Sequence, residues 1–191
     1  MAHRKLIGEQ APSVTLPNYD GETYTLEFTP GVPTAIFFYP KAGSYGCTKE
    51  ACQFRDAIAE KNTFAAGKVQ IVGISADPVE KQKAFVEKHK LTYPVLSDAN
   101  GEARKAYGIG KGLFGLAETA RVTVIVDGKG VIRDTTEGTL NYGAHSKFVT
   151  KWLDKLEAEA AKSAETETVP AAEAAPAPAA EPAPAPAATE A

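Results

Sequence analysis

The sequence predicts a single α/β domain in which helices cover both faces of a mixed β-sheet. Two continuous apolar runs of strand length, at 33–39 and 69–74, are each followed by a segment with helical patterning. Alternating strands and helices are typical of parallel strands with helices packed on their faces, and continuous apolar runs indicate strands buried on both sides. Two later strand-like runs flank a turn, which predicts that antiparallel strands join the same sheet.

The first half of the chain contains a hairpin, a strand and a helix. Alternating residues on either side of the turn at 18–21 predict an N-terminal β-hairpin. The strand at 33–39 ends before Pro40, because proline cannot continue a central ladder. A helix is expected from Cys47 to about Glu60.

In the second half of the chain, the residues at 77–80 predict the start of a helix. Asp77 is expected to be the N-cap, Pro78 the first helical residue and Glu80 the third, and the helix should run to about His89. The remaining expected elements are a strand at 93–96, a helix at 99–107 capped by Asp98, strands at 121–126 and 131–135, and a helix from about Ala144 with Phe148, Trp152 and Leu156 on its core face. This order fits a thioredoxin-like α/β/α sandwich with a mixed central sheet.

The composition changes near residue 160. Residues 161–191 contain fourteen alanines, six of the thirteen prolines and no aromatic residue. Such a segment buries too little apolar surface to offset its ordering entropy. We therefore expect a folded domain at 1–160 and a disordered tail at 161–191.

Charge and hydropathy exclude several classes of function. The tail holds one of the 21 basic and five of the 24 acidic residues, so the rest of the chain is nearly neutral. A neutral domain gives no electrostatic reason to expect nucleic acid or an anionic membrane as a partner. No apolar run approaches the roughly 18 residues of a membrane span, and the N-terminus lacks a signal-peptide core. The cytosol is the expected compartment, with the nucleus left open.

The two cysteines occupy a position suited to chemistry. Cys47 falls in the first turn of the helix that follows the strand at 33–39. The free amides and the dipole of a helix N-terminus stabilise an anion, so a thiolate is favoured there. Cys52 follows five residues later, and in an ideal helix the two Cα atoms lie about 8.6 Å apart. Because a disulfide needs Cα atoms within about 7 Å, the two thiols can pair only if this turn unwinds.

The segment around these cysteines resembles a known family. The pattern Pro40-x-x-x-Ser44-x-x-Cys47, on a strand, loop and helix, resembles the active-site signature of the peroxiredoxin (AhpC/TSA) family. The string at 46–56 is similar to the bacterioferritin-comigratory-protein, or PrxQ, branch. The resemblance covers roughly residues 5–158 and continues through the segments at 97–101, 106–108, 121–127 and 130–133.

The resemblance implies a thiol peroxidase that reduces hydrogen peroxide and organic hydroperoxides in antioxidant defence. Cys47 matches the peroxidatic cysteine, whose thiolate becomes a sulfenic acid. Cys52 matches the resolving cysteine, which would form an intramolecular disulfide with Cys47 that thioredoxin reduces. Arg121 matches the arginine that supplies positive charge to the thiolate and the peroxide. The further implied site residues are Pro40 as a shield, Ser44 as a hydroxyl partner, Gly46 as an amide donor and Glu50 as a support for Arg121.

Two positions differ from the usual family pattern. The family usually has threonine where this chain has Ser44, so the hydroxyl is kept and the methyl that fixes its rotamer is lost. Tyr45 also stands where proline is frequent.

No metal or cofactor is expected, and a monomer is expected because both thiols lie in one chain.

Other interpretations are weaker. Gly110-x-Gly112-x-x-Gly115 matches a dinucleotide fingerprint, but it follows a helix instead of a strand. A cysteine hydrolase would need a histidine base, and the three histidines, His3, His89 and His145, are expected to be solvated or terminal. A thioredoxin-fold binding or chaperone module with a redox-sensing thiol pair stays open. A thiol–disulfide oxidoreductase is disfavoured by the five-residue cysteine spacing.

Overall fold

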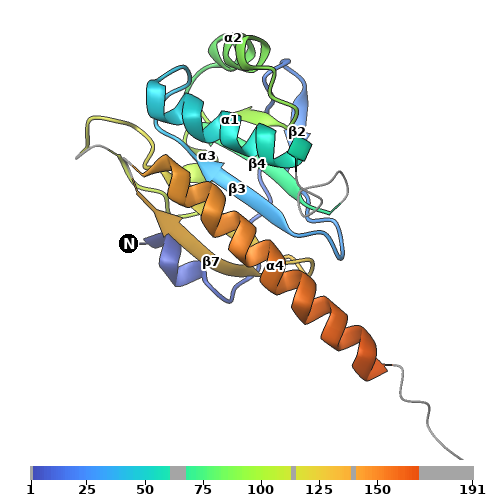
Figure 1. Ribbon diagram of the computed structural model, residues 1–191. Coiled ribbons are helices and arrows are strands. Elements are labelled where there is room, and N and C mark those ends of the chain that lie inside the picture. The colour runs from blue at the N-terminus through green and yellow to red at the C-terminus, as the bar shows by residue number, and fades with distance from the viewer. Residues whose placement is uncertain (1, 61–67, 113–114, 139–140, 168–191) are drawn as a thin grey trace, which may run out of the picture.

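A five-stranded sheet and a separate two-stranded hairpin form the framework of the protein. The computed structural model describes residues 2–60, 68–112, 115–138 and 141–167. The strands are β1 (Thr15–Pro17), β2 (Thr23–Thr25), β3 (Thr34–Phe38), β4 (Gln70–Ser75), β5 (Val95–Ser97), β6 (Val122–Val126) and β7 (Ile132–Glu137). The helices are η1 (Ala2–Leu6, a 3-10 helix), α1 (Tyr45–Glu60), α2 (Val79–His89), α3 (Glu102–Ala106) and α4 (Tyr142–Glu167). Figure 1 shows the long α4 crossing in front of the sheet.

The sheet is mixed, as the sequence predicts. Its strand order is β5-β4-β3-β6-β7, and β3, β4 and β5 run parallel to one another. β6 is antiparallel to both β3 and β7. β3 therefore lies in the centre with a partner on each side, and all five of its residues are buried, which explains its continuous apolar sequence.

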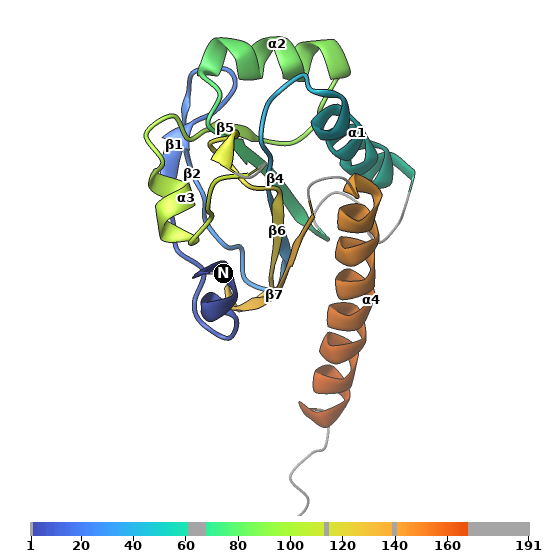
Figure 2. The ribbon, with the colours of Figure 1, turned by 90° about the vertical axis from the view of Figure 1, so that its left-hand side faces the viewer.

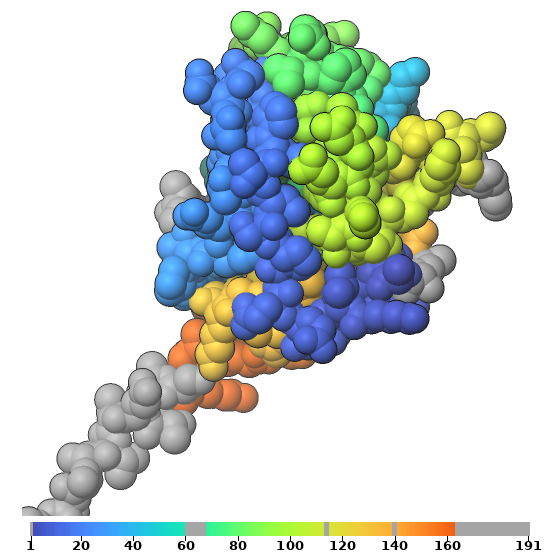
Figure 3. Space-filling view, turned by 180° about the vertical axis from the view of Figure 1, so that it is seen from behind, coloured from blue at the N-terminus to red at the C-terminus, as the bar shows by residue number. Residues whose placement is uncertain are grey.

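Two layers cover the sheet. Alternate residues of β3 point to opposite faces, so Phe37 packs with α1, α2 and α4 while Phe38 packs toward the hairpin and α3. Figure 2 shows the sheet between α1 and α4 on one side and the hairpin, α3 and the N-terminal turn on the other. Figure 3 shows this second face, where the blue N-terminal residues lie beside the yellow-green α3. The predicted α/β/α sandwich and N-terminal hairpin are confirmed.

The start of α2 differs from the predicted capping box. Pro78 is the N-cap, and no side chain caps the helix by a hydrogen bond. The Asp77 carboxylate instead accepts a 2.6 Å hydrogen bond from the backbone N–H of Ala42 and pairs with Lys81. The prediction that Asp77 is the N-cap is therefore wrong, because its side chain is used to hold the loop after β3.

The core face of α4 also differs from the prediction. The buried side chains are His145, Val149, Leu153 and Leu156. Phe148 and Trp152 are only partly buried and lie at the edge of the core. A strict spacing of four drifts around a helix of 3.6 residues per turn, so a stripe that stays on one face needs a step of three, as from Leu153 to Leu156.

The domain boundary predicted at residue 160 falls inside α4, which continues to Glu167. Residues 168–191 of the predicted tail lie outside the described residues, so the division into domain and tail stays a prediction. Within the part of the chain that the structure describes, no helix, α4 included, combines the length and the apolar character needed to cross a bilayer.

Gly73 in β4 makes room for the aromatic side chain of Phe37 in the neighbouring β3. A Cβ atom at this position would lie 2.7 Å from Cζ of Phe37. We expect Gly73→Ala to lower the free energy of unfolding by about 1–3 kcal/mol, because the ring must move within a packed core. Urea unfolding measures this. Gly110→Ala is the control, since its added Cβ meets no atom within 4 Å, and an equal loss in both variants would contradict the explanation.

Candidate active site

The candidate site lies where β3 ends and α1 begins. Pro40 starts the connecting loop, and α1 begins at Tyr45 with a 2.9 Å bond from the Thr48 N–H to the Ser44 carbonyl. Cys47 is the third residue of α1 and is 1 % exposed. The thiol therefore sits at the N-terminus of a sixteen-residue helix, where the backbone favours a negative charge.

Arg121 reaches the thiol from the neighbouring strand. The pairing of Phe38 with Val122 places the residue before β6 next to the end of β3. From there Arg121 Nη2 donates a 3.2 Å hydrogen bond to Cys47 Sγ, and Nη1 donates to Glu50 Oε2. One guanidinium thus bridges two residues of α1, and all three side chains are nearly inaccessible to solvent. The arrangement supports the sequence-based expectation that Glu50 holds Arg121 in place.

Burial governs the protonation of the groups around Arg121. Removal from water raises the pKa of Glu50 to about 7, although the nearby Arg121 charge acts in the opposite direction. Burial also lowers the pKa of His145 to about 4, with Arg121 adding to the effect. His145 Nδ1 lies 3.5 Å from Glu50 Oε1. The expectation that His145 is solvated is wrong, because it extends the buried face of α4.

A cavity of about 650 Å³ opens beside Cys47. Five of the predicted site residues line it, namely Pro40, Ser44, Gly46, Cys47 and Arg121. The other lining residues come from four further segments: Lys41 and Tyr45, Ala76 to Pro78, Leu116 to Glu118, and Tyr142. Glu50 and Cys52 are not among the described residues that line it. Leu116, Tyr142 and Pro78 contribute apolar surface to the lining.

Two of the predicted residues have specific local geometry. An added Cβ on Gly46 would lie 3.2 Å from Arg121 Nη2 and 3.2 Å from a ring carbon of Tyr142. Glycine at this position therefore lets Arg121 approach the helix. The Ser44 hydroxyl donates a 3.0 Å bond to the Lys41 carbonyl, so in this structure it braces its own loop.

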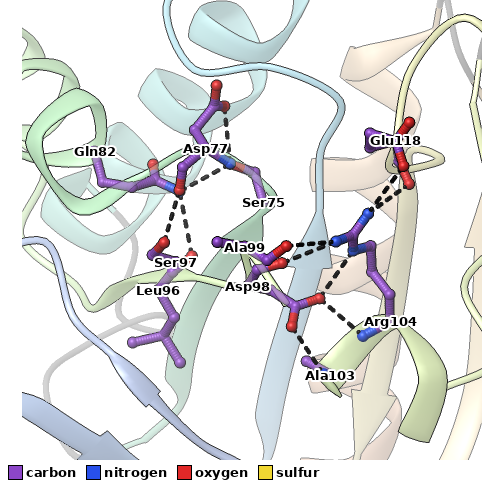
Figure 4. A network of polar contacts seen from close by, with 10 residues as sticks. All are labelled: Ser75, Asp77, Gln82, Leu96, Ser97, Asp98, Ala99, Ala103, Arg104 and Glu118. Atoms are coloured by element: carbon purple, nitrogen blue, oxygen red, sulfur yellow. Dashed lines mark hydrogen bonds and ion pairs between the residues drawn. The ribbon is translucent and has the colours of Figure 1, made fainter. Parts of the chain in front are cut away.

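Polar contacts hold two of the residues that line the cavity, Asp77 and Glu118, to the neighbouring elements (Figure 4). On one side Asp77 holds the loop after β3, and its own carbonyl accepts a 2.8 Å bond from Ser97. On the other side Arg104 donates to the fully buried carboxylate of Asp98 at 3.0 Å and to the Glu118 carbonyl at 2.9 Å. Arg104 therefore fixes the segment that contains Leu116 and Glu118 and leads into Arg121.

Comparison with known proteins agrees with this geometry. The profile of the AhpC/TSA family matches residues 7–135, which is more than half of the chain. The chain belongs to the AhpC/TSA family. A chloroplastic peroxiredoxin Q of Suaeda salsa is 36% identical over 149 residues, which cover 78% of this chain and 68% of that protein. A chloroplastic peroxiredoxin Q of Populus jackii is 39% identical over 126 residues, 66% of this chain and 57% of that protein.

Solved structures give the same assignment within the AhpC/TSA family. A crystal structure of a Mycobacterium tuberculosis peroxidoxin superposes with a TM-score of 0.68 and 36% sequence identity, covering 80% of this chain and 96% of the other. The chain is thus an AhpC/TSA protein of the peroxiredoxin Q type, a thiol peroxidase with two cysteines, Cys47 and Cys52. Its fold is the thioredoxin-like fold that the sequence predicts.

Sequence reasoning missed several residues of the peroxiredoxin site. His145 lies four residues before Val149, so a buried stripe traced back from Leu156 in steps of three and four would have reached it. Tyr142, Leu116 and Arg104 carried no such pattern, because long-range packing alone brings them to the cavity. The residues at 113–114 of the glycine-rich fingerprint lie outside the described residues.

The Asp98–Arg104 pair provides a test of the network. We expect Arg104→Met to lower the free energy of unfolding by about 2–3 kcal/mol, because a buried carboxylate loses its cation while it keeps two backbone N–H donors. Chemical unfolding measures the change. Lys105→Met, at the exposed neighbouring position, is the matched control and should change stability little. Equal stabilities for the two variants would show that the pair does not support the fold.

Proposed function

We propose that the chain reduces hydrogen peroxide and organic hydroperoxides at Cys47 and is recycled by thioredoxin or a similar dithiol protein. The contact between Arg121 Nη2 and the buried Cys47 Sγ, at the start of α1 and beside a cavity, carries this proposal. The fixed cation and the helix N-terminus favour negative charge at the sulfur and stabilise the charge that develops on the peroxide oxygens. The apolar lining supports organic hydroperoxides as substrates.

The first step consumes the peroxide. The Cys47 thiolate attacks one peroxide oxygen, the O–O bond breaks, and the sulfur becomes a sulfenic acid. The leaving oxygen takes a proton and departs as water or an alcohol. Arg121 acts on both the sulfur and the oxygens, Gly46 and Cys47 offer backbone N–H groups, and Pro40 keeps water from the sulfur. Glu50 acts through Arg121 and is a positioning residue.

The second step forms the disulfide. The Cys52 sulfur attacks the Cys47 sulfenic acid, and water leaves as the S–S bond forms. Both cysteines are free and both lie in α1. Since five helical residues separate Cα atoms by about 8.6 Å, the first turns of α1 must unwind for this bond to form. The Tyr93 hydroxyl donates a 2.8 Å bond to the carbonyl of Ala51, the residue before Cys52, so the helix is held at the C-terminal end of the segment between the two cysteines.

Two thiols within one chain support a monomer as the working unit. A reducing compartment such as the cytosol supplies the dithiol partner that the cycle requires. In that setting the activity serves antioxidant defence and redox homeostasis.

A coupled assay with thioredoxin, thioredoxin reductase and NADPH tests the proposal. The parent chain should consume peroxide continuously, and Cys47→Ser should lose the reaction entirely. Cys52→Ser should react once and then stop, because its sulfenic acid has no partner thiol. Continued turnover by Cys47→Ser would exclude Cys47 as the reacting residue, and failure of thioredoxin to sustain the parent chain would exclude it as the reductant.

Oxidation should also change the structure of α1. We expect the backbone amide of Thr48, which bonds to Ser44 in the reduced chain, to exchange with deuterium much faster after one equivalent of peroxide. In Cys52→Ser the same treatment yields only the sulfenic acid, and exchange should stay slow. Unchanged exchange in a fully disulfide-bonded parent chain would show that the helix does not open.

A further inference from the structure

A buried polar cluster lies next to the Cys47–Arg121 contact and connects α1, β6 and α4. Its members are Glu50, Thr123 and His145, each at most 1 % exposed, and none of the three lines the cavity. His145 Nδ1 lies 2.8 Å from Thr123 Oγ1 and 3.5 Å from Glu50 Oε1. Glu50 Oε1 has no hydrogen-bond partner among the described residues.

The hydrogen bonds fix which nitrogen carries the hydrogen when the imidazole is neutral. His145 Nε2 lies 3.2 Å from the Gly138 carbonyl oxygen. A carbonyl can only accept, so Nε2 carries a hydrogen, and in the neutral imidazole Nδ1 is then an acceptor that faces both Thr123 Oγ1 and Glu50 Oε1. An ionised Glu50 would then place its unbonded oxygen against a lone pair. One proton, carried either on Glu50 Oε1 or on His145 Nδ1, would remove this repulsion between the two atoms.

The count of charges leads to the same conclusion. Arg121 contacts both Cys47 and Glu50. If both residues are ionised while His145 is neutral, the cluster together with Cys47 and Arg121 holds two anions and one cation away from water. A net negative charge is costly in a buried site, so the Cys47 and Glu50 anions compete for the Arg121 guanidinium. One proton on the Glu50–His145 pair leaves the cluster neutral with the thiolate intact.

We propose that His145 is a positioning residue for the peroxidase reaction, which holds one proton jointly with Glu50 and so leaves the charge of Arg121 to the Cys47 thiolate. This inference rests on the proposed function. The titratable or charged groups facing Glu50 are Arg121 beside β6, His145 on α4, Cys47 on its own helix and Tyr93 before β5. Burial raises the pKa of Glu50 and lowers that of His145, which places the proton mainly on Glu50, and the two groups titrate as a pair.

The proposal predicts a particular dependence on pH. Below about pH 7 the pair keeps its proton, and the Arg121 charge serves the thiolate. As the pH rises the pair loses the proton, and Glu50 becomes a second anion that draws on Arg121. Each Cys47 thiolate should then react more slowly with peroxide, by about tenfold, the effect of a one-unit interaction between ionisable groups.

The test uses the full chain with Cys52→Ser, so that Cys47 alone reacts. The rates of a single turnover with hydrogen peroxide and of alkylation by iodoacetamide are measured from acid to alkaline pH. The background is compared with added His145→Asn, which can keep the contact with Thr123, and with His145→Gln, which can reach the Gly138 carbonyl. Ser146→Ala, on the next residue of α4, is the matched control.

The neutral side chains in His145→Asn and His145→Gln distinguish a role in holding a proton from a role in packing. If His145 holds a proton, both variants should fold with a melting temperature close to that of the background. Their alkaline decline should lie at a different pH, by about one unit. Glu50→Gln should abolish the decline, and Ser146→Ala should match the background. Folded His145 variants with an unchanged profile would overturn the proposal, because a merely structural histidine tolerates a neutral substitute.

Two further outcomes are decisive. If neither His145 variant folds, NMR of labelled histidine in the unsubstituted chain replaces them. Imidazole shifts of His145 that follow a neutral-pH transition support the pair, and shifts that stay constant overturn it. If alkylation shows the decline but peroxide does not react with Cys47, the proposed function fails while the effect of the pair on the thiolate stands.

Discussion

One guanidinium group stands between two acidic side chains that are both cut off from solvent. Arg121 contacts Cys47 and Glu50, which lie one helical turn apart on α1. The antiparallel pairing of β3 and β6 places this cation at the end of the central strand. The rest of the site is arranged around that contact: glycine at position 46 leaves it space, and the loops behind the cavity hold the residue that precedes β6 in position.

In the proposed cycle, the first turns of α1 must be formed when Cys47 reacts and must unwind when Cys52 reacts. The N-terminus of α1 stabilises the thiolate only while its first turn is formed, yet the second cysteine can reach the first only after that turn unwinds. The contacts around α1 fall into two groups. The contacts of Cys47 and Glu50 with Arg121 stabilise the closed helix, whereas the bond from Tyr93 to Ala51 lies at the far end of the segment that opens.

Local sequence patterns predict the elements and the reactive cysteine, and long-range geometry accounts for what they miss. The apolar runs identify β3 and β4 because these strands are buried on both faces. Cys47 is predictable because the strand, loop and helix around it are visible in the local sequence, and a helix N-terminus favours negative charge on a thiol. Asp77 is misassigned because a side chain that can cap a helix can equally hold a neighbouring loop, and only the fold decides between them. His145 is missed because the value of a lone histidine depends on Glu50, ninety-five positions earlier in the chain.

The length and direction of α4 separate the two ends of that helix by function. Its first residue, Tyr142, lines the cavity, and its 26 residues extend about 39 Å. Glu167 therefore lies far from Cys47, at the end of the helix that points away from the sheet in Figure 1. A surface, dye or carrier protein joined beyond this point would leave the mouth of the cavity accessible. Ala2, in contrast, packs closely on the domain. A Cβ atom added to Gly108 would lie 2.9 Å from the Ala2 backbone, so a group attached next to Ala2 would lie against the folded domain.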